Sequence, residues 1–338
     1  MDLTQLFSRR DNKRSREESQ PHRDKAAFII SIDTELLWGY VLHPNHKMER
    51  LLKQAERAGR GPIDSLLALF EKYHITATWA IVGHLFLDQC EKEGGLPHKD
   101  MPRFRNNWYS WDPCSNIQQS PLYYGKDIVE AIRFSKVEHE IGYHSFSHCY
   151  FSECSREVAE AEICKGEELA KQLGITLRSF VFPANKIGHI ELLKRHEFRI
   201  YRGPVVWGKG TGGTKEGFLL RAANLVRRRT MAQPVEPIWR DGIWEIPGSM
   251  HFCATRFSLD LALRAKRGIQ AAIRNRKIFH MHMHPEDFLA APDLLSRLEQ
   301  VLEFVSARTA EGELQVITMG ELSSLLDQRK LTLGGRRR

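Results

Sequence analysis

The chain has 338 residues, of which 42% are hydrophobic and 27% charged, so it can bury a sizeable core and is not disordered throughout. Its formal net charge of +8 comes mostly from the two ends, because residues 1–25 carry +2 and residues 327–338 carry +4. The nearly neutral body does not favour nucleic acid as a partner, and both ends are predicted to be disordered basic arms around one domain at 26–326.

The sequence also bears on the cellular compartment. No apolar segment of signal-peptide length opens the chain, and none approaches the roughly 18 apolar residues of a membrane span, so we expect a cytoplasmic protein. Its cysteines are Cys90, Cys114, Cys149, Cys154, Cys164 and Cys253. They contain no C-x-x-C pair, which predicts reduced, mostly buried thiols rather than a zinc ribbon or a disulfide framework.

Strands and helices are predicted to alternate along the chain. The run A-A-F-I-I-S-I at 26–32 predicts a buried strand, and a helix at 63–73 and a strand at 75–83 follow it. Further strands are expected at 138–143, 178–183, 198–202, 242–247, 277–284 and 315–318, with helices between them. This alternation predicts a parallel α/β sheet, and about seven strands favour a distorted (β/α)7-type barrel over a doubly wound sheet. The first strand is not followed by the G-x-G-x-x-G of dinucleotide-binding folds.

Residues 91–127 interrupt the alternation with several prolines and aromatic residues. A loop of this length within a compact domain is usually functional or disordered, and its aromatic content argues against disorder. We interpret it as an aromatic-rich insertion that either lines a substrate groove or packs onto the body of the domain.

Polar side chains follow several of the predicted strands. Asp33 and Glu35 follow the first strand, His144 and His148 follow a later one, and His284 ends the strand I-F-H-M-H-M-H. In a parallel barrel the carboxyl ends of the strands meet at one rim, so these groups are expected to converge.

Two pairs of histidines share the spacing H-x-x-x-H, and geometry separates them. On a strand, His280 and His284 would lie roughly 13 Å apart, which is too far to share a metal ion. On a turn after a strand, His144 and His148 face the same way and can converge. Two histidines and a carboxylate are a common ligand set of catalytic zinc, so Asp33 or Glu35 can bind while the other carboxylate acts as a base.

Six motifs, in this order, resemble those of the polysaccharide deacetylase family (carbohydrate esterase 4, NodB-homology). They are S-I-D-T-E-L-L-W-G, A-T-W-A-I-V-G-H, E-I-G-Y-H-S-F-S-H, S-F-V-F-P-A-N, W-E-I-P-G-S and I-F-H-M-H-M-H-P-E-D. The resemblance covers roughly residues 26–326. It implies a distorted (β/α) barrel that removes N-acetyl groups from sugars with a divalent metal, often zinc.

The resemblance also implies roles for individual residues. Asp33 matches the catalytic base, His144 and His148 match metal ligands, and His284 matches the general acid. Glu35 is then the expected third ligand, with Asp33 as the alternative.

The sequence departs from the family pattern in two places. Thr34 separates two acids that are usually adjacent, although a subgroup of the family has an acid-x-acid arrangement. Ala184 stands where related sequences place an arginine that orients the catalytic carboxylate; Lys186 or Arg178 could take its place.

The remaining site predictions concern the substrate, an N-acetylated sugar or glycan precursor. The expected substrate-binding residues are Asn185, Trp38, Trp244, His280 and His282, of which the two histidines could instead support His284. Zinc is the expected metal, with other divalent ions open. Two alternatives remain: a hydrolase of a small or cyclic amide, and a degenerate, non-catalytic glycan-binding barrel. The sequence does not indicate the oligomeric state.

Overall fold

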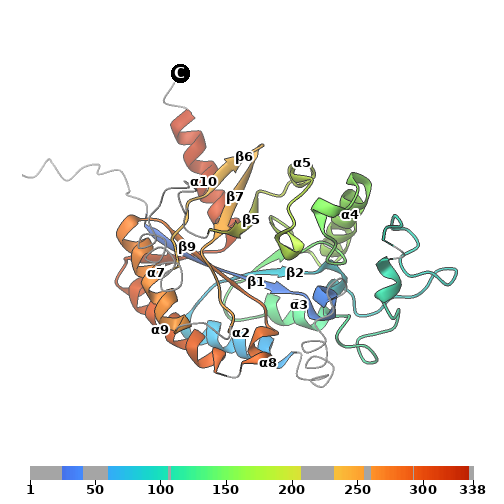
Figure 1. The fold of residues 1–338 in the computed structure, drawn as a ribbon, viewed down its shortest axis with the longest axis horizontal. Coiled ribbons are helices and arrows are strands. Elements are labelled where there is room, and N and C mark those ends of the chain that lie inside the picture. The colour runs from blue at the N-terminus through green and yellow to red at the C-terminus, as the bar shows by residue number, and fades with distance from the viewer. Residues whose placement is uncertain are drawn as a thin grey trace, which may run out of the picture.

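The computed structural model describes residues 25–40, 60–105, 108–206, 232–254, 260–291 and 293–334. In these residues a mostly parallel sheet is surrounded by helices (Figure 1), so the predicted α/β class is confirmed. The strands are β1 (Ala26–Thr34), β2 (Thr78–Ile81), β3 (Glu140–Tyr143), β4 (Ser179–Val181), β5 (Ile200–Val205), β6 (Ile238–Arg240), β7 (Ile243–Gly248), β8 (Met250–His251), β9 (Ile278–Met283) and β10 (Leu314–Val316).

The order of the strands gives the sheet the form of a nearly closed ring. Neighbouring strands follow the order β6-β7-β5-β4-β3-β2-β1-β9-β8, and β10 adds to β1. The ladder does not close on itself, but β8 continues β7 after the single residue Ser249. One stretch of chain therefore pairs first with β5 and then with β9. This is the distorted (β/α)7-type arrangement expected from the sequence.

β1 is an interior strand of the ladder, and all nine of its residues are buried. It pairs in parallel with β2 and β9, so both of its edges are covered. A strand buried on both faces needs a continuous apolar run rather than an alternating one, which explains A-A-F-I-I-S-I.

The helices cover the outside of the sheet. They are α2 (Gly61–Tyr73), α3 (Lys126–Arg133), α4 (Arg156–Gln172), α5 (Ile190–Arg195), α7 (Leu261–Asn275), α8 (Asp287–Ala290), α9 (Leu294–Ala310) and α10 (Met319–Gly334). α9 packs between α2 and α7 on one side of the barrel (Figure 1). α4 begins as predicted, because the side chain of Ser155 accepts a hydrogen bond from the backbone N–H of Val158. Among the described helices, none has the length and apolar character that a bilayer crossing needs.

The carboxyl-terminal helix departs from the expected basic arm at 327–338. α10 continues to Gly334, and its contacts with the barrel explain why. Asp327 accepts a hydrogen bond from the Trp244 indole at 2.9 Å, and the Lys330 ammonium lies 3.1 Å from the centre of the Trp239 ring. These tertiary contacts extend the helix through a stretch whose composition alone indicated disorder. The predicted arm at 1–25 lies almost wholly outside the described residues, as do residues 335–338.

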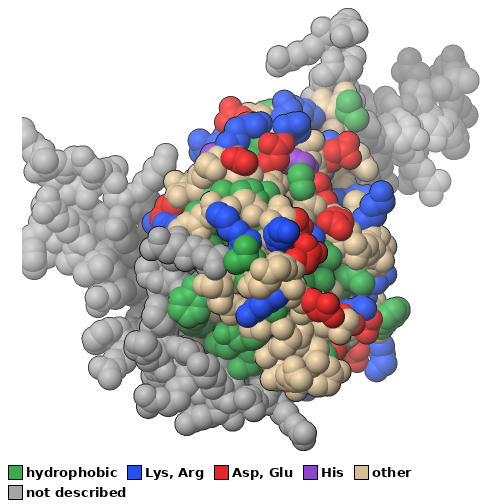
Figure 2. All heavy atoms as spheres, turned by 90° about the vertical axis from the view of Figure 1, so that its right-hand side faces the viewer, with side chains coloured by type: hydrophobic (Ala, Val, Ile, Leu, Met, Phe, Trp, Pro, Cys, Tyr) green, Lys and Arg blue, Asp and Glu red, His purple; other side chains and the backbone are tan. Residues whose placement is uncertain are grey.

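The aromatic insertion packs onto the barrel. Trp108, Tyr109 and Tyr124 are almost fully buried, whereas Trp111 is exposed. Most of these rings therefore pack onto the body of the domain, which was one of the two interpretations of residues 91–127. On the face that includes this region, the described Lys and Arg side chains are interspersed with Asp and Glu (Figure 2). This distribution agrees with the nearly neutral body of the sequence.

Candidate active site

The predicted catalytic groups meet at one rim of the barrel. Asp33 lies at the carboxyl end of β1 and Glu35 directly after it, while His144 follows β3 and His284 follows β9. The Nε2 atom of His284 lies 3.6 Å from Asp33 Oδ2 and 3.7 Å from Glu35 Oε1. Parallel pairing places these strand ends side by side, as expected from the sequence.

Glu35, His144 and His148 form the centre of the site. Glu35 Oε1 lies 2.9 Å from His144 Nε2 and 3.1 Å from His148 Nε2. All three residues are buried, and their ligand atoms lie within 4.8 Å of one another. Burial alone would raise the pKa of Glu35, but the facing imidazoles of His148 and His144 hold it well below its usual range.

A tight, non-helical turn brings the two histidines together. Ser145 and His148 have left-handed backbone conformations, with φ of 58° and 60°, and the two imidazole centres lie 5.1 Å apart. The turn is fixed from two sides. The N–H groups of Gly83 and His84 donate to the carbonyls of Ser145 and Phe146, each at 2.8 Å.

A second set of hydrogen bonds fixes this turn from the side of α4. The Glu162 carboxylate accepts hydrogen bonds from the backbone N–H and the hydroxyl of Ser147, at 2.8 and 2.6 Å. The Tyr109 hydroxyl, from the aromatic insertion, donates to the same carboxylate at 2.9 Å. The turn therefore presents His144 and His148 from a rigid frame.

The hydrogen bonds of His144 show that these residues fit a metal ion. Its Nδ1 lies 2.7 Å from the carbonyl oxygen of Val181, and a carbonyl can only accept, so Nδ1 carries the proton. In the neutral imidazole, Nε2 then points a lone pair at Glu35 Oε1. The pair is satisfied either by a proton on Nε2, which lets the imidazolium donate to the carboxylate and lower its pKa, or by a metal ion bound to both atoms. A backbone carbonyl behind the ligating ring is also the usual arrangement at metal sites.

Asp33 has a different partner from the one expected. The Arg202 guanidinium, on β5, donates two hydrogen bonds to its carboxylate, each at 2.5 Å. Both side chains are buried. Burial alone would raise the pKa of Asp33, but the charge and hydrogen bonds of Arg202 lower it below its usual value. Arg202 therefore has the orienting role that the sequence analysis suggested for Lys186 or Arg178.

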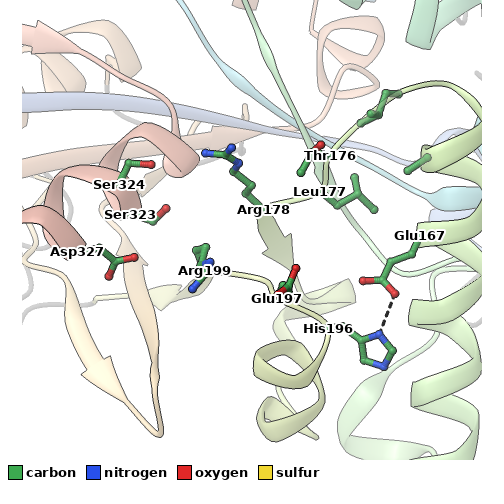
Figure 3. A pocket seen from close by; sticks show the side chains of 12 residues that line it. Glu167, Thr176, Leu177, Arg178, His196, Glu197, Arg199, Ser323, Ser324 and Asp327 are labelled. Atoms are coloured by element: carbon green, nitrogen blue, oxygen red, sulfur yellow. Dashed lines mark hydrogen bonds and ion pairs between the residues drawn. The ribbon is translucent and has the colours of Figure 1, made fainter.

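The two candidates from the sequence lie elsewhere. Lys186 pairs with Glu153 at 3.3 Å on the surface. Arg178 precedes β4 and lines a pocket of about 590 Å³ at the amino ends of the strands, the end of the barrel opposite to the site. Arg178 and Arg199 line that pocket together with Asp327 of α10 (Figure 3). Nothing in the single sequence distinguished Arg202 from an exposed arginine; its burial follows from its place between β4 and β7.

His280 supports this ion pair instead of contacting a substrate. It is fully buried, and its Nδ1 donates to the carbonyl of Pro247 at 3.2 Å. Its Nε2 can then only accept, so the Ser31 hydroxyl donates to it at 2.9 Å and accepts from Arg202 at 3.1 Å. His280 was expected to contact the substrate, but it precedes His282 by two residues on β9 and so lies farther from the rim.

His284 is oriented from its rear face. Its Nδ1 lies 3.3 Å from Asp287 Oδ2 and 3.2 Å from His251 Nε2. Burial alone would lower the pKa of His284, but the hydrogen bond with Asp287 and the charges of Glu35 and Asp33 raise it to about 10. Its Nε2–H therefore points toward the two carboxylates at neutral pH. His282 lies beside this group and stacks on His251, with ring centres 4.7 Å apart.

Of the remaining predicted substrate contacts, Asn185 is exposed after β4 at the same rim, so its role stays a prediction. The two tryptophans do not lie on a substrate surface. Trp38 is fully buried and donates to the carbonyl of Tyr123 at 3.1 Å. Trp244 is the second residue of β7, at the opposite end of the barrel, where its indole donates to Asp327 of α10. Both were expected to stack on sugar rings because they are tryptophans. The burial of Trp38 and the position of Trp244 at the opposite end of the barrel argue against that role.

A family model described as polysaccharide deacetylase matches residues 60–198. A protein described as a polysaccharide deacetylase from Mycobacterium smegmatis has the same fold, with a TM-score of 0.59 and 13% identity over 92% of this chain and 93% of that one. A second protein described as a polysaccharide deacetylase, from Pseudomonas aeruginosa, has a TM-score of 0.55 and 10% identity over 89% of this chain and 90% of that one. An allantoinase has a TM-score of 0.55 and 13% identity over 90% of this chain and 91% of that one. No curated protein matches this sequence.

The structural likenesses show the fold at these identities, and the family match confirms the resemblance found in the motifs. The matched segment contains the turn that carries His144 and His148. Polysaccharide deacetylases are hydrolases of carbon–nitrogen bonds other than peptide bonds, and the predicted enzyme class is confirmed at this level.

Replacing Gly39 should displace the Glu35 carboxylate. A Cβ at position 39 would overlap Glu35 Oε2, so we expect Gly39→Ala to weaken zinc binding about 10–100-fold, the usual cost of disturbing the support of a ligand. The measurement is zinc affinity by competition with a chromogenic chelator. Gly61→Ala is the matched control, because a Cβ there meets nothing within 4 Å. Wild-type affinity in Gly39→Ala would contradict the assignment of Glu35 as a ligand.

Arg202→Met should lower the free energy of unfolding by about 3–5 kcal/mol, because it leaves the Asp33 charge buried without a partner. The depressed pKa of Asp33 stabilises the wild type above the unfolded pKa of about 3.9, and this contribution is lost as pH falls through the folded pKa. Acid also neutralises the buried carboxylate of the variant. The difference measured by urea denaturation should therefore shrink on acidification.

The control for Arg202→Met is Arg240→Met. Arg240 pairs with Glu245 at 2.6 Å, but its side chain is 53% exposed. We expect that substitution to lower the free energy of unfolding much less than Arg202→Met does, because solvent screens the charge of an exposed guanidinium. Equal losses in the two variants would contradict the proposed importance of the buried pair.

Proposed function

On the premise that this chain is a homologue of the polysaccharide deacetylases, we propose that it is a metal-dependent hydrolase that removes N-acetyl groups from a sugar or glycan precursor. One observation carries the proposal. Glu35, His144 and His148 bring their ligand atoms together, and His284 Nε2 lies 3.6 Å from Asp33 Oδ2 and 3.7 Å from Glu35 Oε1 beside them. These five residues occur in the motifs that suggested the family.

The residues present fit a divalent metal held by Glu35, His144 and His148. When bound, such an ion supplies a Lewis acid that polarises the amide carbonyl and lowers the pKa of water. Zinc suits a ligand set of two histidines and a carboxylate, although nitrogen and oxygen ligands also suit other divalent ions. We assign Glu35 rather than Asp33 as the carboxylate ligand, because the Asp33 carboxylate is held by Arg202.

Asp33 and His284 perform the two proton transfers. Asp33 is ionised and accepts a proton from the water whose oxygen attacks the acetamide carbon. Arg202 fixes the orientation of this carboxylate. His284 is protonated, and its Nε2–H donates to the amide nitrogen as the C–N bond breaks. The products are acetate and a free amino sugar.

A small or cyclic amide is the second candidate substrate. It is favoured by the fold shared with an allantoinase, at a TM-score equal to that of one of the deacetylases. The acid-x-acid arrangement of Asp33 and Glu35 also departs from the usual adjacent pair. A degenerate, non-catalytic barrel is less well supported, because Arg202 supplies the orienting cation that Ala184 does not.

We expect the zinc-loaded protein to release acetate from N-acetylated oligosaccharides or nucleotide sugars and to leave small and cyclic amides intact. Acetate release and amide loss are measured on the same preparation. Hydrolysis of the cyclic amides alone would replace the first candidate with the second. A metal-loaded protein that hydrolyses none of these substrates would support the non-catalytic barrel.

Asp33→Asn and His284→Ala should separate binding from chemistry. We expect both variants to keep their zinc and to lose about 10²–10⁴-fold in kcat, the usual contribution of a general base or acid. His144→Ala should instead lose the zinc itself. Zinc content and kcat are measured for each variant. Wild-type turnover in Asp33→Asn or His284→Ala would remove the proposed role of that residue.

A further inference from the structure

A second cluster of metal-ligating side chains lies outside the site described above. His84, Cys90, His98 and Asp112 each offer one ligand atom, and these four atoms lie within 4.8 Å of one another. Asp112 Oδ2 is 2.9 Å from His84 Nε2, 2.7 Å from His98 Nε2 and 2.9 Å from Cys90 Sγ. His84 lies just after β2, and the other three belong to the loops around the aromatic insertion.

Burial distinguishes this cluster from an ordinary surface group of polar residues. The side chains of His84 and Asp112 are fully buried, and that of His98 is 7% exposed. The second oxygen of Asp112 is already occupied, because it accepts from the Tyr124 hydroxyl at 3.0 Å and from the backbone N–H of Cys114 at 2.9 Å. The first oxygen alone therefore faces the two imidazoles and the thiol.

The hydrogen bonds of His84 repeat those of His144. Its Nδ1 lies 2.9 Å from the carbonyl oxygen of Tyr123, so Nδ1 is the donor. The Nε2 of a neutral ring then presents a lone pair to Asp112 Oδ2, as His144 presents one to Glu35. A cation between the facing acceptors satisfies both, and the carbonyl behind the ring fixes the ligating tautomer.

We propose that His84, Cys90, His98 and Asp112 bind a structural zinc ion. Nitrogen, sulfur and oxygen ligands in a set of four match the tetrahedral sites that zinc prefers, and the thiol disfavours magnesium and calcium. Four protein ligands leave no open position, which indicates a structural rather than a catalytic ion.

The position of this centre indicates what it stabilises. The Tyr123 carbonyl that faces His84 also accepts from the Trp38 indole at 3.1 Å, and the Trp38 and His84 rings are 4.5 Å apart. Trp38 lies in the short helix η2 (Leu36–Tyr40) that follows Glu35. The backbone N–H of His84 donates to Phe146, within the turn that carries His144 and His148. The second ion would therefore hold the insertion against two segments that carry hydrolase-site ligands.

Cobalt substitution tests the proposal, because sulfur bound to Co²⁺ gives a near-ultraviolet charge-transfer band and the hydrolase site contains only nitrogen and oxygen ligands. We expect the full-length protein to take up two Co²⁺ ions and to show this band. Cys90→Ser should lose the band. His144→Ala should lose one ion and keep the band, which separates this site from the proposed catalytic one.

The matched controls are serine replacements of two other thiols. Cys164 is exposed on α4, and the Cys253 thiol lies 3.3 Å from His251 Nδ1, near the hydrolase site. Both variants should keep the band. A wild-type protein that binds one ion and shows no band would overturn the proposal, and this outcome does not depend on the folding of any variant. A band that persists in Cys90→Ser or disappears in Cys253→Ser would also overturn it.

Discussion

Two carboxylates are buried at one rim of the barrel, and the arrangement of the site depends on how each is balanced. Asp33 and Glu35 are only two residues apart, yet they face different partners. Arg202 neutralises the first, and the imidazoles of His144 and His148 face the second. A buried carboxylate without a partner would be costly, so each of the two needs a partner of its own. Because the partners differ, the two carboxylates are suited to different roles. In the proposed mechanism, the carboxylate that Arg202 orients accepts the proton, and the carboxylate that faces the two imidazoles binds the metal ion.

Much of this arrangement could be predicted from the sequence. The apolar run of β1 and the turn after β3 are local features, and parallel pairing brings their carboxyl ends together. What the sequence did not show was depth and direction within the barrel. Periodicity predicted one face for His280 and His284, but β9 ends at Met283, and His280 is fully buried within the strand and supports Arg202 through Ser31. Periodicity assigns a side chain to a face, whereas its accessibility depends on the layers above it.

Arg202 and the second cluster were missed for a related reason. An arginine in a short strand has the same local pattern whether it is exposed or paired in a core, and only the neighbouring strands decide. His84, Cys90, His98 and Asp112 follow no regular spacing, because loops without repeating structure bring them together. With a single cysteine among them, the cluster has none of the paired spacing by which metal sites are usually recognised in sequences.

The two candidate metal centres follow the same physical rule. In each, a backbone carbonyl holds Nδ1 of a buried histidine, and Nε2 faces a carboxylate oxygen. The insertion contains little regular secondary structure, so backbone ladders contribute little to its stability. Ions that bind only the folded state add their binding free energy to folding, which suits a segment of this kind. His84 joins the centres, because its ring faces one and its backbone N–H holds the turn of the other. Order in the insertion is thereby coupled to order among the hydrolase-site ligands.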